Sequence, residues 1–154
     1  MHANHRINVI IDQKIASPGK ESLIRVAAQT LRAEGIRNDI AMNLLLTDDA
    51  RIKILNRQFL GRNESTDVIS FGAKKMHSPN KKLKGFIGEI VISTQMAEYN
   101  ARRFDTTFQK EIFLYVIHGI LHLLGYGDKT KKEKSIIQEK QTKIFEAICG
   151  QLNS

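Results

Sequence analysis

The chain has few of the residues that would cross-link it covalently or carry it through a membrane. It has a single cysteine, Cys149, which excludes an internal disulfide and a thiolate cluster for a zinc finger or an iron–sulfur centre. The longest uninterrupted apolar run, residues 112–117, is too short to span a bilayer. The opening "MHANHRINVIID" lacks the apolar core and cleavage site of a signal peptide. We therefore expect a cytoplasmic protein without a membrane partner, in which any metal is held by His, Asp or Glu.

The sequence also lacks the features that separate domains. It has only two prolines, no internal repeat, no low-complexity tract and no stretch of linker composition. A chain of 154 residues, 42% hydrophobic and 26% charged, has the size and composition of one globular domain. We predict a single domain over residues 1–154.

Hydrophobic spacing predicts helices and strands in mixed order. Apolar alternation or short apolar runs predict four strands, at residues 6–12, 40–46, 66–71 and 88–93. Helical spacing predicts a first helix after Gly19 that stops at Gly35, and a second one, capped by Thr47, that ends near Gly61. Three more helices are predicted at residues 94–103, 107–124 and 131–151. This pattern indicates an α+β fold with one sheet and an all-helical end.

Positive charge is in excess and unevenly distributed. The 24 Lys and Arg residues against 16 Asp and Glu give a net charge of +8, which favours a polyanionic partner, with nucleic acid the first candidate. Residues 72–86 hold five lysines and no acid, and residues 129–143 hold six lysines and two acids. These lysines could simply solvate a loop and a helix face. Because a candidate metal site lies between the two stretches, we favour a phosphate-binding surface that includes Lys81, Lys82 and Lys84.

Two of the five histidines lie four residues apart in an apolar helix. His118 and His122, in "FLYVIHGILHLL", lie one turn apart on the same face and can reach one cation together. The alternative is a pair of core histidines satisfied by hydrogen bonds. Burying two unpaired imidazoles at ligand spacing is costly, so we predict a metal site.

The glycine after the first histidine bears on the chemistry. Peptidases with the H-E-x-x-H pattern use the glutamate at this position as general base, and here the residue is Gly119. The spacing therefore predicts a metal but argues against that peptidase mechanism. Glycine inside a helix costs about 1 kcal/mol relative to alanine, which indicates close approach of a backbone or substrate, or close packing against another helix.

A turn after the second histidine brings a third candidate ligand. Gly125 can adopt a positive φ, end the helix and return the chain toward the metal, and Asp128 follows three residues later. Asp128 could instead be a turn or cap residue. However, Thr130 and Glu133 already form a capping box for the last helix, which leaves Asp128 free to be a ligand.

These segments resemble a known family. "HGILHLLGYGD", preceded by "LNRQFLGRNESTDVISF" and "GEIVIS", is similar to the YbeY family of bacterial metal-dependent endoribonucleases, which are implicated in ribosomal RNA maturation and ribosome quality control. The resemblance covers about residues 55–128. It implies a zincin-like fold, a mixed four-stranded sheet packed with about five helices. It also implies one zinc ion, or another divalent transition metal, held by His118, His122 and a third ligand.

The sequence departs from the family pattern at two places. Where the family has Gly-Tyr-Asp-His, with the last histidine as third ligand, this chain has Asp128 at the ligand position and Gly127 before it. A carboxylate is a competent zinc ligand beside two histidines, and Gly127 would let the backbone move inward. Where the family has Tyr-Arg, this chain has Phe59-Leu60, so Arg57 and Arg62 become the candidates to stabilise phosphate.

The leading hypothesis is a metal-dependent endoribonuclease specific for single strands. Its partners would be RNA, small-subunit ribosomal RNA first, and ribosome-associated proteins. The first alternative is a non-catalytic RNA-binding or ribosome-binding protein with a structural metal, which the missing arginine favours. A metallopeptidase is the third, and Gly119 argues against it.

Overall fold

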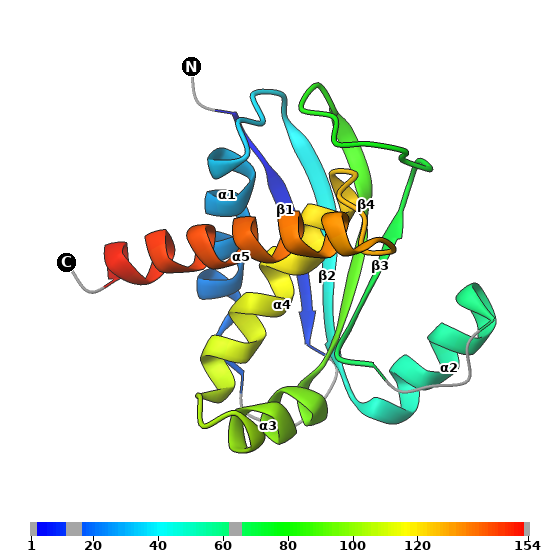
Figure 1. Ribbon diagram of the computed structural model, residues 1–154, viewed down its shortest axis with the longest axis vertical. Helices are drawn as coiled ribbons and strands as arrows, with labels where there is room; N and C mark the ends of the chain where they lie inside the picture. Colours follow the sequence, from blue (N-terminus) through cyan, green and yellow to red (C-terminus); the bar gives the residue numbers. More distant parts are fainter. Residues whose placement is uncertain (1–2, 12–16, 62–65, 153–154) are drawn as a thin grey trace.

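A computed structural model describes residues 3–11, 17–61 and 66–152, and over these ranges the chain forms a four-stranded mixed sheet with five helices (Figure 1). The strands are β1 (Arg6–Ile11), β2 (Ile40–Thr47), β3 (Val68–Gly72) and β4 (Gly85–Ser93). Their spatial order is β1-β2-β4-β3, with β1, β2 and β4 parallel and β3 antiparallel to β4. The predicted fold class is thereby confirmed. Asp12, the last residue of the first predicted strand, lies outside the described ranges.

The five helices follow the predicted order. They are α1 (Lys20–Ala33), α2 (Asp49–Leu60), α3 (Thr94–Arg103), α4 (Phe108–Leu123) and α5 (Lys131–Leu152). Gly35 and Gly61, the predicted stops of the first two, have φ of 73° and 68°, a left-handed conformation that glycine adopts without strain. Among the described residues, no helix is both long enough and apolar enough to cross a membrane.

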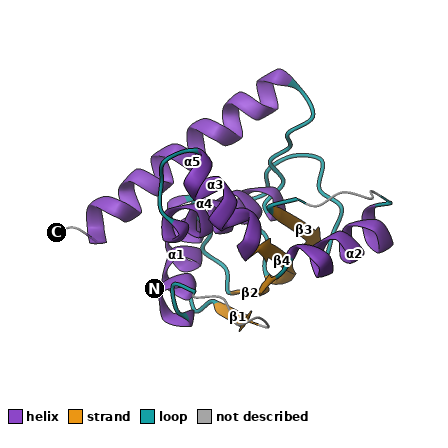
Figure 2. Cartoon of the chain, turned by 90° about the horizontal axis from the view of Figure 1, so that it is seen from below, coloured by secondary structure: helices purple, strands orange, loops and turns teal. Residues whose placement is uncertain are grey.

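Helix α4 is the central element of the core. It lies between the sheet and α5 (Figure 2), and it contacts α1, α3, α5, β3 and β4. Its fully buried residues include Ile112, Ile117 and Ile120. A smaller cluster of Ile52, Ile69 and Val91 attaches α2 to the opposite face of the sheet, as expected from the alternation of side chains along strands. The result is a rigid central helix that carries both histidines.

Three predicted boundaries differ from the structure. Thr47 is the last residue of β2, paired with Ser93, and the cap of α2 is Asp48, whose carboxylate accepts from the Arg51 amide at 2.8 Å. Strand β3 begins at Val68, two residues after its predicted start, although the Ser93 amide of β4 still donates to the Asp67 carbonyl oxygen at 2.9 Å.

Strand β4 begins three residues before the prediction, at Gly85, and passes through Gly88 instead of starting at it. A Cβ on Gly88 would lie 2.3 Å from the Phe71 carbonyl oxygen. This glycine therefore permits the close approach of β3 inside the strand, and it does not mark the predicted strand start.

Close packing explains the mid-helix Gly119. A Cβ at this position would lie 2.7 Å from Cγ2 of Ile90, which is fully buried on β4. The Gly119 carbonyl also accepts from the Ser70 hydroxyl of β3 at 3.1 Å. The helix therefore approaches a strand here, whereas the sequence had left open a second helix, a backbone or a substrate.

We predict that Gly119→Ala destabilises the fold. Overpacking against Ile90 should cost about 1–3 kcal/mol and outweigh the roughly 1 kcal/mol that alanine adds in helix propensity. Urea denaturation of the metal-free protein measures the change. Ile90→Ala opens space for the new methyl group, so the double variant should be more stable than the sum of the two single changes implies. A stabilised Gly119→Ala protein would contradict this packing.

Candidate metal centre

Helix α4 presents the two histidines toward each other. The rings of His118 and His122 lie edge to face, with centroids 4.5 Å apart, and their Nε2 atoms are 3.0 Å apart. Both residues are half-buried. Residues four apart on a helix are neighbours on one face, so the predicted spacing produces this arrangement directly.

The other ring nitrogens are already engaged. His122 Nδ1 lies 2.8 Å from the carbonyl oxygen of Tyr126, and His118 Nδ1 lies 2.8 Å from Oε1 of Gln141 on α5. Both oxygens are acceptors, so each Nδ1 carries the proton and donates it. Each Nε2 of the neutral rings is then an unprotonated lone pair. The hydrogen bonds thus set the tautomer that a metal ligand requires.

Electrostatics favour the neutral ring at His122. Burial and the neighbouring His118 lower the pKa of His122 from its ordinary value, and the Asp128 carboxylate opposes them only in part. Two neutral rings whose lone pairs face each other repel at this distance, and a cation bound by both removes the repulsion. The arrangement therefore favours the predicted ligand pair over two core histidines that hydrogen-bond each other.

Asp128 completes the group after a glycine turn. Gly125 has a φ of 110°, as predicted, and the chain returns so that Asp128 Oδ2 lies 3.5 Å from His122 Nε2. One ligand atom from each of His118, His122 and Asp128 lies within 4.8 Å of the others. The structure thus brings together the three predicted metal ligands.

The spacing of these atoms fits a small divalent ion. Zinc bound at about 2.0–2.1 Å to two nitrogens of a tetrahedral site holds them about 3.3 Å apart, close to the 3.0 Å between the two Nε2 atoms. Two imidazoles and a carboxylate form a donor set typical of sites that leave a fourth position open. The Asp128 side chain is 55% exposed, so this open side faces the surface.

Neighbouring residues show why Asp128 is not needed as a helix cap, and how the backbone at Gly127 differs from the expectation. Thr130 and Glu133 form the predicted capping box of α5, with reciprocal side-chain to amide contacts of 3.0 and 3.1 Å. A Cβ on Gly127 would lie 2.1 Å from Glu133 Oε2. Gly127 does not adopt the positive φ that only glycine favours. Gly127 therefore does not use the positive φ that the predicted conformational freedom would offer, and the Glu133 carboxylate beside it ends a flexible side chain that can move aside.

A wide cavity of about 770 Å³ opens over the metal ligands. Both histidines and Asp128 line it, together with Lys74, Lys75, His77 and Lys129 and with the carboxylates of Asp67 and Glu133. The loop between β3 and β4 reaches this site because the Asn80 amide donates to the Leu124 carbonyl at 3.0 Å. The β3–β4 loop, which carries the basic stretch, and the turn that carries Asp128 therefore form two sides of one cavity.

The described members of the predicted RNA-binding and catalytic sets are not in the lining of this cavity. Lys81, Lys82 and Lys84 are exposed on the same loop, but the lining of this cavity does not include them. Arg57 is exposed on α2, also outside the lining, whereas Leu60 lines the cavity and is 48% exposed. Arg62 lies outside the described residues. The position where the motif resemblance led us to expect arginine therefore does face the site, and leucine occupies it.

Sequence reasoning missed several residues of the site. Gln141 orients His118 from 23 positions further along the chain, and no local pattern indicates that contact. Lys74 and Lys75 belong to the basic stretch, but charge alone does not tell which lysines face the ligands. The hydrogen bond from His122 to the Tyr126 carbonyl was not predicted either, although the turn that contains Tyr126 was.

The peptidase alternative conflicts with the packing. A general base at position 119 would need a side chain where a single Cβ already meets Ile90. The space beside the first histidine is filled by the core of the sheet. This surface of α4 therefore has no room for the glutamate of an H-E-x-x-H site.

Comparison with known proteins agrees with the geometry. The family model "Endoribonuclease YbeY" matches residues 7–149. A protein of that name from Pelotomaculum thermopropionicum is 36% identical over 136 residues, covering 85% of this chain and 84% of the relative. One from Thermotoga maritima is 39% identical over 120 residues, covering 75% and 73%.

A solved structure extends this agreement to the fold. The solution structure of a Thermotoga maritima protein superposes with a TM-score of 0.67 at 34% identity, covering 96% of this chain and 91% of that one. The mixed sheet, the histidine pair on α4 and the matched segments thus point to one family. This chain belongs to the endoribonuclease YbeY family of metal-dependent hydrolases.

Proposed function

We propose that this chain is a single-strand-specific endoribonuclease that uses one zinc ion held by His118, His122 and Asp128. The observation that carries the proposal is the pair of Nε2 atoms 3.0 Å apart, with both Nδ1 protons directed away to Gln141 and Tyr126. Family membership supplies the reaction class, cleavage of RNA. The choice of zinc rests on the two-histidine, one-carboxylate donor set.

The protein side chains hold the substrate and keep the ligands in place. When bound, a divalent metal supplies Lewis acidity toward a phosphoryl oxygen and lowers the pKa of water. Gln141 and the Tyr126 carbonyl hold the two rings in the ligand tautomer. Lys74, Lys75 and Lys129 place positive charge along the cavity, where a phosphate backbone can lie.

The proposed biological setting is ribosomal RNA maturation and ribosome quality control in the cytoplasm. Small-subunit ribosomal RNA is the proposed substrate, and ribosome-associated proteins are the proposed partners. The motif resemblance supports this setting, and the net charge of +8 suits binding to a large polyanion. A cleavage assay tests the activity itself. Single-stranded RNA should be cut by the wild type and not by the His118→Ala, His122→Ala double variant, and equal cleavage by both would refute the enzyme.

We predict that removing any one ligand lowers metal content. Elemental analysis of purified protein should find about one divalent ion per chain in the wild type, and much less in His118→Ala, His122→Ala or Asp128→Ala. Glu146→Ala is the matched control, because Glu146 is an exposed acid on α5. Full occupancy in Asp128→Ala would remove Asp128 from the ligand set. Thermal unfolding with and without a chelator gives a second readout, because a bound ion stabilises the folded state.

We predict that Leu60→Arg raises RNA cleavage. Leu60 lines the cavity over the metal ligands, and an added guanidinium there can offset charge that develops on the phosphoryl oxygens. Removing one preorganised donor typically costs about 100-fold in rate, which sets the scale for adding one. Arg57 and Arg62 stay our candidates for supplying that cation in the wild type. The Arg57→Ala, Arg62→Ala pair should therefore lower cleavage without loss of metal.

The control for these variants is Leu60→Met, which keeps an apolar side chain of similar volume. If neither Leu60→Arg nor the arginine pair changes the rate while His118→Ala abolishes it, phosphate stabilisation comes from the metal or the lysines.

We predict that neutralising lysines weakens RNA binding without regard to sequence. Two multiple variants test the two parts of the loop separately. The first combines Lys74→Gln and Lys75→Gln, which line the cavity. The second combines Lys81→Gln, Lys82→Gln and Lys84→Gln, which lie outside its lining. Each lost phosphate contact should flatten the salt dependence of binding by roughly 0.7 log units on single strands. Titrations of two unrelated oligonucleotides at several salt concentrations measure the slope. An unchanged slope in either variant assigns those lysines to solvation.

A further inference from the structure

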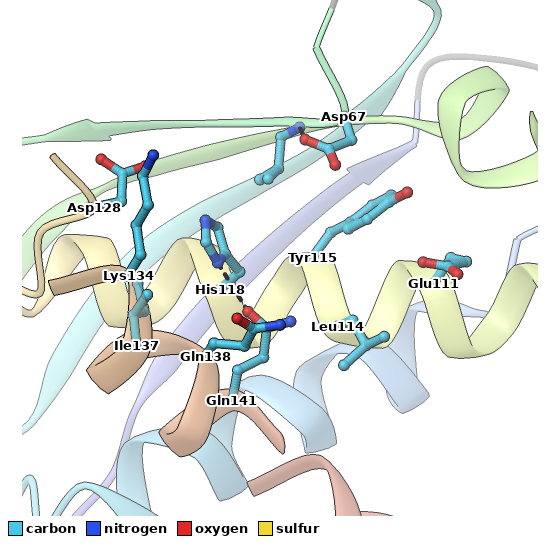
Figure 3. Close-up of a pocket in the computed structure, with 11 residues that line it drawn as sticks. Asp67, Glu111, Leu114, Tyr115, His118, Asp128, Lys134, Ile137, Gln138 and Gln141 are labelled. Atoms are coloured by element: carbon cyan, nitrogen blue, oxygen red, sulfur yellow. Dashed lines mark hydrogen bonds between the residues drawn. The ribbon is translucent and has the colours of Figure 1, made fainter. Parts of the chain in front are cut away.

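A second cavity lies on the other side of the first metal ligand. It has a volume of about 380 Å³, within the roughly 300–1,000 Å³ range of small-molecule sites. It is formed between the start of β3, the middle of α4 and the first half of α5 (Figure 3). Asp67, Val68, His118 and Asp128 line both cavities. The two spaces therefore meet at the metal ligands, and one substrate can occupy both.

The two cavities differ in charge. The larger one has Lys74, Lys75 and Lys129 in its lining, which balance the carboxylates of Asp67, Asp128 and Glu133. The smaller one has three carboxylates, from Asp67, Glu111 and Asp128, and a single cation, Lys134. A phosphate is repelled by such a lining, whereas a neutral group rich in hydrogen-bond donors is attracted.

The deep end of the smaller cavity is built from buried polar groups. Glu111 is 7% exposed, and one of its oxygens accepts from the Thr106 hydroxyl at 2.6 Å. Tyr115 is 6% exposed, and its hydroxyl accepts from the Asn100 side-chain amide at 2.7 Å, which leaves the hydroxyl proton to donate. Burial raises the pKa of Tyr115, so it stays protonated. Buried acceptors and a buried donor thus line the same cavity as His118 and Asp128.

The remaining residues of the lining supply apolar side chains and amide donors. Val68, Leu114 and Ile137 line the cavity with apolar side chains. Gln141 uses its Oε1 for His118, so its amide nitrogen is left as a donor, and Gln138 lies beside it at the rim (Figure 3). Proteins bind unstacked RNA bases by this combination of apolar contact and hydrogen bonds to the base edge.

We propose that the smaller cavity is a nucleobase subsite that selects guanine next to the scissile phosphate. The proposal rests on the endoribonuclease function proposed above and deepens it. Guanine presents two adjacent donors, N1–H and N2–H, and one acceptor, O6, on its Watson–Crick edge. Asp67 and Glu111 supply acceptors for the first two, and Tyr115 and the glutamine amides supply donors for the third.

Other bases match this lining less well. Uracil presents one donor between two acceptors, so two carboxylates would face its carbonyl oxygens. Cytosine and adenine each present one amino group, followed by an acceptor nitrogen. Since one good bidentate contact is worth roughly tenfold or more in base discrimination, guanine should be preferred by about that factor.

The first test is cleavage of single-stranded oligonucleotides that carry each of the four bases at the positions flanking one cut site. We expect at least about tenfold faster cleavage with guanine at one of those positions. Asp67→Asn keeps an oxygen for the Val68 amide but loses an acceptor and a charge, and Gln138→Leu loses the amide at similar size. Both should shrink the guanine preference without loss of metal. Glu146→Gln and Gln109→Leu, at exposed positions outside the cavity, are the matched controls and should retain the preference.

The second test does not depend on catalysis. Guanosine and uridine are titrated separately into metal-free protein, and the side-chain amide signals of Gln138 and Gln141 are followed by NMR. Guanosine should shift these signals in the wild type and less in Asp67→Asn, and uridine should leave them in place.

The outcomes separate the subsite from the enzyme. Metal-dependent cleavage with no base preference, or a preference unchanged in Asp67→Asn and Gln138→Leu, overturns the subsite and leaves the nuclease. Guanosine binding that depends on Asp67, in a protein that cuts no RNA, supports the subsite and overturns the nuclease. Equal shifts by guanosine and uridine overturn the selectivity.

Discussion

The site depends on the direction of two protons. His118 and His122 can act as ligands together only if each keeps its proton on Nδ1, and each does so because a carbonyl oxygen lies 2.8 Å away. If either oxygen moved, its ring could turn or change tautomer, and the facing nitrogens would hydrogen-bond each other. The surrounding fold keeps these oxygens in place: one belongs to the turn that follows α4, and the other to α5, which packs across α4.

Local patterns predicted that His118, His122 and Asp128 come together, because the forces that place them are local. Spacing of four residues in a helix puts two side chains on one face, and a glycine with positive φ reverses the chain within three residues. The capping box likewise involves residues only three apart. The position of Asp128 beside the two histidines could therefore be predicted from neighbouring sequence alone, and its role as a third ligand stays a prediction.

Other features depended on contacts between distant segments and could not be read in this way. Thr47 and Asp48 both have side chains that cap helices, and pairing of Thr47 with Ser93 decides between them. Gly88 resembled the start of a strand, yet its role is set by the Phe71 backbone on the neighbouring strand. Gln141 and the lysines that face the cavity were missed for the same reason, because their positions depend on how α5 and the β3–β4 loop pack on α4.

In the proposed metal site, the contact between Gln141 and His118 makes the docking of the last helix part of the metal affinity. A ring oriented only when α5 is in place binds the ion more tightly in the docked state than in any state where α5 is detached. Thermodynamic linkage is reciprocal, so the bound ion must stabilise the docking of α5 by the same free energy. Hydrogen exchange along α5 would then report metal occupancy, although none of the three ligands lies on that helix.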